Sequence, residues 1–201
     1  MPKVVDHDER RREIGAAMWR LLLRDGMSAI TVRALAAEVG CSVGALQYYF
    51  KSQDELILFA TGEMLVSIAR RMGSLDFHDP DLDVLQKAIE EMLPLDRQRK
   101  AEAQVWFSLL TRRITSPEVA ARAHDLDLVV RSAVHQVLAE LSTANFISAG
   151  CDLAVEAVRL HALIDGLALH ALFEPPLDSP EAIRAAINTH LRQLSRLGDD
   201  H

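Results

Sequence analysis

The side chains best suited to chemistry lie in one short stretch, QYYFK, at positions 47–51. Gln47 carries a donor and an acceptor, which suits bidentate pairing with an adenine edge in the DNA major groove. Tyr48 and Tyr49 have hydroxyl groups that can donate to a phosphate, and the positive charge of Lys51 attracts one. This set of side chains on a helix with few apolar positions predicts a surface that reads DNA.

The residues just before this stretch suit the same partner. Gly44 and Ala45 are small, so their helix can approach closely, and the Ala45 or Val43 methyl groups can meet a thymine methyl. The hydroxyl of Thr31, with the helix N-terminus behind it, can bind phosphate, and Arg33 lies one turn further on. The candidate DNA-binding residues are Thr31, Arg33, Ser42, Val43, Gly44, Ala45, Gln47, Tyr48, Tyr49 and Lys51.

Two short helices have to position these side chains. Thr31 is expected to cap a helix over residues 32–39, which Gly40 ends, and Ser42 to cap a second helix over residues 43–50. Helix, glycine turn and helix at this spacing predict a helix-turn-helix.

The apolar residues of the same segment indicate how the two helices are held. Ala36 is small where they must approach closely, and Leu35, Val39 and Leu46 can lock both onto a preceding helix. Leu46 and Phe50 are four residues apart and can both point inward. The residues that then point mostly outward are Val43, Gly44, Ala45, Gln47, Tyr48 and Tyr49. The outward face is then offered to another molecule.

Further helices are predicted before and after the helix-turn-helix. Apolar residues recur at helical spacing over residues 8–24, and Gly26 follows as a C-terminal glycine. Ser52 and Glu55 have the spacing of a capping box, which starts a further helix running to about Arg71.

Later helix starts are marked by serine or aspartate followed by proline. DPD at Asp79, SPE at Ser116 and SPE at Ser179 each supply a cap, a proline at the first helical position and an acid in the first turn. Two more helices are expected over about residues 97–114 and 149–174, the latter ended by the proline pair PP.

Composition agrees with a helical chain. Apolar residues make up 49% and charged residues 25% of the 201 residues, and alternating β-type patterns are absent. The predicted fold class is all-α with about nine helices. Residues 1–53 are expected to form a three-helix DNA-binding head, and residues 54–201 a helical body for ligand binding and dimerisation.

Charge is unevenly distributed along the chain. Residues 1–53 hold eight Lys/Arg and six Asp/Glu, a net +2, whereas the rest holds 14 and 23, a net −9, within an overall charge of −7. The basic residues at Arg10, Arg11 and Arg12 can add phosphate or minor-groove contacts. A net +2 over this length is small, so charge alone does not decide for nucleic acid.

Several function classes lack their motifs. The chain has no phosphate-binding glycine loop, HExxH or GxSxG, so no enzymatic activity and no cofactor are expected. His161 and Asp165 share a helix face, but two ligands do not make a metal site. No apolar run could span a membrane, which places the protein in the cytoplasm. Cys41 and Cys151 are expected to be free thiols.

The segment TVRALAAEVGCSVGALQYYFKSQDEL resembles the DNA-binding domain of TetR-type transcriptional repressors, and the resemblance covers about residues 9–60. Gln47 and Tyr48 depart from the family pattern at positions that tune operator choice. LPLDRQRKAEAQVWFSLL and IDGLALHALFEP are similar to the regulatory domain of the BetI-like branch. The positions that carry the first resemblance are Thr31, Ala36, Gly40, Gly44, Leu46, Tyr49, Phe50, Lys51, Ser52, Glu55 and Leu56.

The resemblance implies a homodimer joined through the last two helices. Its two heads would bind a palindromic double-stranded DNA operator in major grooves ~34 Å apart. A small-molecule effector would enter the body between the fourth and eighth helices and release the DNA. Two alternatives remain open, namely an activator on the same scaffold and a helical ligand-binding protein with a vestigial head.

Effector candidates are apolar and aromatic residues of the body, with His161 and Asp165 as polar anchors. Such residues at helical spacing are more often plain core, so both interpretations stand. The small and apolar residues of the last two helices likewise fit either core packing or a dimer seam. The candidate effector residues are Met64, Ile68, Met92, Trp106, Phe107, Leu110, His161, Ile164, Asp165 and Leu167.

Overall fold

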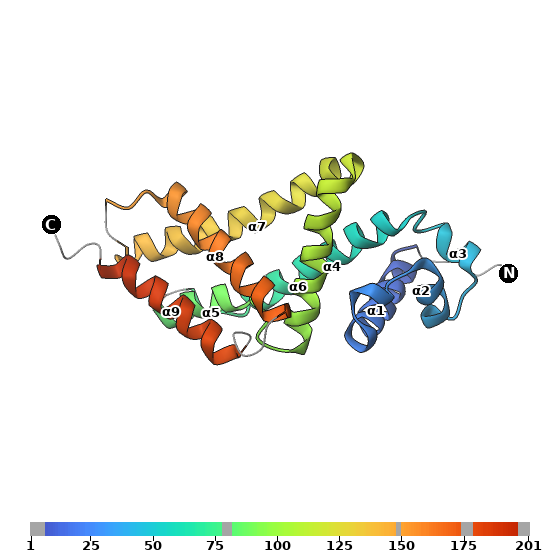
Figure 1. Cartoon of the computed structure of the whole chain (residues 1–201), viewed down its shortest axis with the longest axis horizontal. Helices are drawn as coiled ribbons and strands as arrows, with labels where there is room; N and C mark the ends of the chain where they lie inside the picture. Colours follow the sequence, from blue (N-terminus) through green and yellow to red (C-terminus); the bar gives the residue numbers. More distant parts are fainter. Residues whose placement is uncertain (1–6, 78–81, 148–149, 174–178, 197–201) are drawn as a thin grey trace. The chain divides into compact units, whose positions relative to one another are not determined.

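The computed structural model describes residues 7–77, 82–147, 150–173 and 179–196, apart from a few terminal side chains. These ranges contain nine α-helices and no strand, which confirms the all-α prediction (Figure 1). The helices are α1 (His7–Asp25), α2 (Val32–Val39), α3 (Val43–Gln47), α4 (Gln53–Met72), α5 (Leu82–Glu90), α6 (Arg97–Thr115), α7 (Pro117–Thr143), α8 (Leu153–Phe173) and α9 (Pro180–Arg196). A 3₁₀ turn, η1 (Met27–Ala29), joins α1 to α2.

Within the described ranges, no helix is both long and apolar enough to cross a membrane. The chain divides into two compact units. The first unit comprises residues 1–65 and 104–123, and the second comprises residues 66–103 and 124–201. Each unit combines segments that are distant in sequence, so the units do not test the predicted boundary between head and body at residue 53. That boundary stays a prediction.

Helix α3 is shorter than expected. It ends at Gln47 rather than Phe50, because the N–H of Tyr49 bonds to the Leu46 carbonyl three residues back, at 2.9 Å. The N–H of Phe50 bonds to the same carbonyl at 3.0 Å, which closes a tight turn. Tyr48 and Tyr49 therefore stand on a turn after the helix.

Helix α8 begins later than expected, at Leu153 instead of residue 149. Asp152 caps it, since its side-chain oxygen accepts the N–H groups of Ala154 at 3.0 Å and Val155 at 3.2 Å. The predicted helix start at Asp79–Pro80 and the predicted stop at Pro175–Pro176 lie outside the described residues.

The first unit is built around the side chains that α1 to α4 bury together. Helix α2 packs against α1 and α3, as a helix-turn-helix requires. Leu35 and Leu46 are completely buried, as predicted, but Val39 is only half-buried. Ala36, which was predicted to lie where the two helices approach closely, is buried as well. The other large, fully buried side chains of α1 and its turn are Ile14, Met18, Leu22 and Ile30.

The second unit has a continuous apolar core. Helix α9 lies beside α5, where Arg184 donates to Glu90 at 3.1 Å and Asn188 to Gln86 at 2.9 Å (Figure 1). The sequence left open whether the apolar residues of the last two helices belong to the core or to a dimer interface. Those that are buried in the single chain belong to its core. These are Leu160, Ile164, Ala168 and Ala171 on α8, and Ile183, Ile187, Leu191 and Leu194 on α9.

Candidate nucleic-acid interface

Two hydroxyl caps and one glycine shape the helix-turn-helix. Oγ1 of Thr31 accepts the N–H of Ala34 at 3.1 Å, and Oγ of Ser42 accepts that of Ala45 at 3.1 Å, as predicted. Gly40 ends α2 with φ 72° and ψ 34°, a left-handed conformation that glycine adopts without a steric penalty. Because a hydroxyl is donor and acceptor at once, both caps keep an O–H to give to a phosphate.

Buried side chains anchor α3 and the turn after it. Leu46 is completely buried and Phe50 is 2% exposed. The Phe50 ring packs on that of Phe59 with centroids 4.9 Å apart. The guanidinium of Arg11 lies over this pair, 6.0 Å and 5.5 Å from the two centroids. The recognition segment is thus tied to both α1 and α4.

The opposite side of α3 is open. Tyr48 is 72% exposed and Val43 40%, and Gly44, Ala45 and Gln47 are exposed as well. Tyr49 is half-buried and stacks edge-on against Tyr48, with centroids 5.3 Å apart. Lys51 and Arg33 are exposed.

Three polar side chains of this surface are unpaired within the described structure. Gln47, Lys51 and Arg33 have no side-chain hydrogen bond or ion pair to another described residue. The N–H of Lys51, in contrast, is bonded to Glu55 Oε2 at 2.8 Å, so only its ammonium group is left for a ligand. We call the exposed side chains of residues 43–51 together with Arg33 the recognition face.

Ion pairs join α2 to α1. Glu38 accepts hydrogen bonds from Arg20 at 3.1 Å and from Arg24 at 3.0 Å. These two bonds hold the pKa of Glu38 below its ordinary value. Arg10 pairs with Glu13 at 2.6 Å, and this bond raises the pKa of Arg10. Arg10 is therefore partly engaged, whereas the charge of Arg11 is held over aromatic rings.

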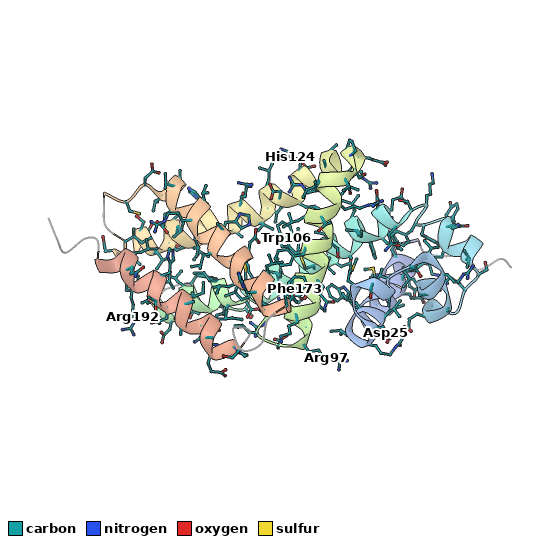
Figure 2. All side chains as sticks on the ribbon, viewed as in Figure 1. Asp25, Arg97, Trp106, His124, Phe173 and Arg192 are labelled. Atoms are coloured by element: carbon teal, nitrogen blue, oxygen red, sulfur yellow. The ribbon has the colours of Figure 1, made fainter. Side chains whose placement is uncertain are left out.

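The predicted effector residues are divided between the two units. Met64, Trp106, Phe107 and Leu110 belong to the first, and Trp106 is buried on α6 (Figure 2). Ile68, Met92, His161, Ile164, Asp165 and Leu167 belong to the second. An effector site made of all these residues therefore stays a prediction.

The second unit contains a groove of about 570 Å³ between α7 and α8. Of the predicted effector residues, His161 lines it. The α7 residues that line the groove, including Arg131 and His135, were not among the predicted effector residues, although they recur at helical spacing. Nε2 of His161 lies 3.7 Å from Oδ2 of Asp165, and the described residues contain no group of three His, Cys, Asp or Glu side chains placed to hold a metal.

The second unit also contains a buried charge cluster that the sequence did not suggest. Arg71 donates to both oxygens of Glu102, at 2.8 Å and 2.7 Å, and to Glu91 at 2.5 Å. Burial by itself lowers the pKa of Arg71, but the bonds to the two carboxylates outweigh it and raise the pKa. Arg71 lies on α4 and Glu102 on α6, and Glu91 directly follows the end of α5.

Both cysteines are free thiols, as predicted, and each is half-buried. Burial, together with the charges of Glu156 and Asp152, raises the pKa of Cys151. A raised pKa leaves less of the reactive thiolate form at neutral pH.

A helix-turn-helix with buried anchors and an open polar face defines a DNA-binding regulator. Residues 14–59 match the family described as bacterial regulatory proteins, tetR family. Residues 82–196 match the C-terminal domain of BetI-type transcriptional repressors.

Similar proteins agree. The HTH-type transcriptional regulator PksA of Bacillus subtilis is 34% identical over 196 residues, which cover 96% of this chain and 94% of that protein. A transcriptional regulator from Rhodococcus has a similar structure, with a TM-score of 0.78 and 26% identity over 95% of this chain and 98% of that one. One from Saccharomonospora viridis, solved with choline, shares the fold at a TM-score of 0.78 and 24% identity, over 92% and 96% of the two chains.

The chain belongs to the TetR family of transcriptional regulators and carries a BetI-type C-terminal domain. Both the family and the branch predicted from the sequence are confirmed.

Proposed function

We propose that the protein is a homodimeric repressor that binds a palindromic operator and leaves it when a small molecule binds the body. One observation carries the DNA-binding part. Gln47 and Lys51 lack partners among the described residues, while Leu46 and Phe50 hold their segment in place. Because Leu46 and Phe50 already hold the backbone of this segment, only the two side chains lose conformational entropy when bases and phosphates bind them.

Each predicted contact has a proposed role on the recognition face. Gln47 pairs with adenine in the major groove, and Val43 and Ala45 contact a thymine methyl. Lys51 and Thr31 bind phosphates and set the register of the helix on the duplex. Arg33, Ser42, Gly44, Tyr48 and Tyr49 complete the predicted surface.

The dimer is supported by an apolar stripe on α8. Val155, Val158, Leu169 and Phe173 are 55%, 62%, 40% and 72% exposed in the single chain, and Phe173 marks the end of the helix (Figure 2). Exposed apolar side chains at these intervals share one helix face, and a second copy would bury them. Two copies would place two α3 helices in grooves ~34 Å apart.

Release by an effector is supported by relatives. The C-terminal match is to a family described as repressors, and the Saccharomonospora structure contains choline. The residues predicted for the effector remain our candidates for its lining. We assign the protein no enzymatic activity, and because its DNA target lies in the cytoplasm, we place it there.

The test starts with duplexes that the wild-type protein selects from a random-sequence pool. In fluorescence anisotropy, Lys51→Ala should weaken binding to all selected duplexes about equally and lower the salt slope by about 0.9. Gln47→Ala should instead reduce the preference for one base pair, by about 1–3 kcal/mol. The DNA-binding role fails if no duplex binds below micromolar concentration at low salt, and the role of Gln47 fails if relative affinities are unchanged.

Transcription from a promoter that carries the selected sequence separates the remaining alternatives. A repressor lowers the yield of transcript and an activator raises it. A vestigial head leaves it unchanged.

A further inference from the structure

In the turn between α1 and α2, residues 26–30, backbone groups are hydrogen-bonded by side chains from distant helices. Gly26 has φ 79° and ψ 177°, and no side chain at the N-terminus of η1 caps that short helix. The N–H of Met27 would therefore be one of the unpaired donors that a helix N-terminus leaves.

Two glutamines from other helices bind this turn. Oε1 of Gln104 on α6 accepts the N–H of Met27 at 3.2 Å, across 77 residues of sequence. Nε2 of Gln53, the first residue of α4, donates to the carbonyl of Ile30 at 2.5 Å. The start and the end of the turn are thus each held by one side-chain amide.

The two helices that supply these amides are themselves joined. Nε of Arg112 on α6 donates to Oδ1 of Asp54 at 2.5 Å, and Oγ of Ser116 donates to Oδ2 at 3.2 Å. Asp54 directly follows Gln53 in α4. A closed ring of polar contacts runs from the turn through α6 and α4 back to the turn, and all of it lies in the first unit.

The turn leads straight into the helix-turn-helix. Ile30 precedes Thr31, which caps α2, and α2 packs against α3. Any displacement of the turn is therefore passed on to α3 through packed helices, because close-packed side chains move together. The turn has influence over the recognition face without belonging to it.

We propose that Gln104 is a positioning residue through which α6 sets the pose of the helix-turn-helix. The inference rests on the proposed function, since it deepens how the body controls DNA binding. Helix α6 is continuous over Arg97–Thr115, and its residues 97–103 belong to the second unit. Two residues before Gln104, Glu102 is bonded to Arg71 in the second unit's charge cluster. A displacement of the α6 segment that carries Gln104 would reach the head through the bond to Met27.

Three variants of Gln104 test separately the effect of its hydrogen-bond acceptor and the effect of its size. Gln104→Leu keeps similar size without an acceptor, Gln104→Ala removes the bulk as well, and Gln104→Glu keeps an oxygen that a helix N-terminus favours. Gln98→Leu is the matched control, because Gln98 lies on α6 but bonds to Ser67 and Glu102 in the second unit.

The first measurement is amide hydrogen exchange at Met27 in the full chain. Gln104→Leu and Gln104→Ala should raise the exchange rate at Met27 about fivefold, because each removes one hydrogen bond. Gln104→Glu and Gln98→Leu should leave the rate as in wild type. Equal acceleration by Gln98→Leu, or no rescue by Gln104→Glu, would overturn the proposal.

The second measurement is affinity for duplexes selected by the wild-type protein. Gln104→Leu and Gln104→Ala should lose about fivefold, evenly across base variants, and Gln104→Glu should bind as wild type does. Unchanged affinity in both Gln104→Leu and Gln104→Ala would overturn the proposal. If the wild type selects no duplex, the proposed function is wrong, and exchange at Met27 still decides whether Gln104 holds the turn.

Discussion

The recognition face and the buried charge cluster use similar chemistry in opposite ways. In the cluster, Arg71 is surrounded by Glu91 and Glu102, and Glu102 is only 3% exposed. On the recognition face, Lys51 and Gln47 are exposed and have no side-chain partner among the described residues. Charges that pair with one another hold helices together, whereas polar groups without a partner among the described residues are available to another molecule.

The comparison shows why residue type alone does not reveal a binding site. An arginine or lysine in the sequence is equally compatible with either use. The difference lies in whether the fold brings a carboxylate within hydrogen-bond distance, since an unpaired buried charge is very costly and an unpaired exposed one is not.

The largest effect should come from breaking the cluster. Glu102→Ala leaves Arg71 half-buried with one of its two carboxylates, so we expect the free energy of unfolding to fall by about 3 kcal/mol. Chemical denaturation measures it. Glu13→Ala, which removes the acid of the exposed pair with Arg10, is the control and should cost less than about 1 kcal/mol. Equal losses in the two variants would show that burial does not distinguish these ion pairs.

A smaller effect should separate folding from binding at the recognition face. A Cβ atom at Gly44 would have no neighbour within 4 Å, so Gly44→Ala should raise stability by about 0.5 kcal/mol. Its methyl group would stand between α3 and DNA, so affinity for selected duplexes should fall about tenfold, close to 1.4 kcal/mol. Anisotropy and thermal unfolding give the two values.

Gly40→Ala is the matched control for that variant. A Cβ atom at Gly40 would also meet nothing within 4 Å, but the residue has a φ of +72°. We expect it to destabilise the protein by about 1 kcal/mol through backbone strain. Full DNA affinity in Gly44→Ala would contradict the close approach that we propose.

The smallest effect should be a pH dependence in the second unit. Nε2 of His190 on α9 lies 3.0 Å from Oε1 of Glu156 on α8, and Arg159 pairs with the same carboxylate. Burial lowers the pKa of His190 from its ordinary 6.5, the Glu156 charge opposes this, and the charge of Arg159 adds to it. The folded protein therefore binds this proton less readily than the unfolded chain does.

Stability should consequently decline as the pH falls below about 6.5 and level off below the folded pKa of His190. Urea unfolding between pH 7.5 and about pH 5 measures this slope, and subtraction of the His190→Asn curve isolates it from the other histidines. A wild-type protein that becomes more stable than His190→Asn on acidification would mean that the pKa of His190 is raised instead.

Much of the head could be predicted because its signals are local. Thr31 and Ser42 cap N–H groups three residues ahead, and Gly40 has the left-handed conformation expected of a glycine that ends a helix. Such bonds depend only on neighbours in the chain. The stop of α3 was misplaced, because a tight turn at residues 48–50 and a further helical turn have similar local sequence preferences.

The body could be predicted less well because its contacts are not local. The apolar periodicity indicated its helices, but not that Arg71 would meet Glu102 or that Glu90 would meet Arg184. The effector residues stay predictions, since apolar residues at helical spacing fit a core and a ligand site equally well.

By itself, the sequence determined the helical fold and the helix-turn-helix, because caps, glycines and periodicity act over a few residues. Only the tertiary structure decided which polar groups remain unpaired and which side chains hold the turn before α2. Gln104 and Met27 are 77 residues apart, and nothing in either residue's neighbourhood marks the other as its partner. A hydrogen bond between distant residues depends on the packing of whole helices, which is settled only when the chain folds.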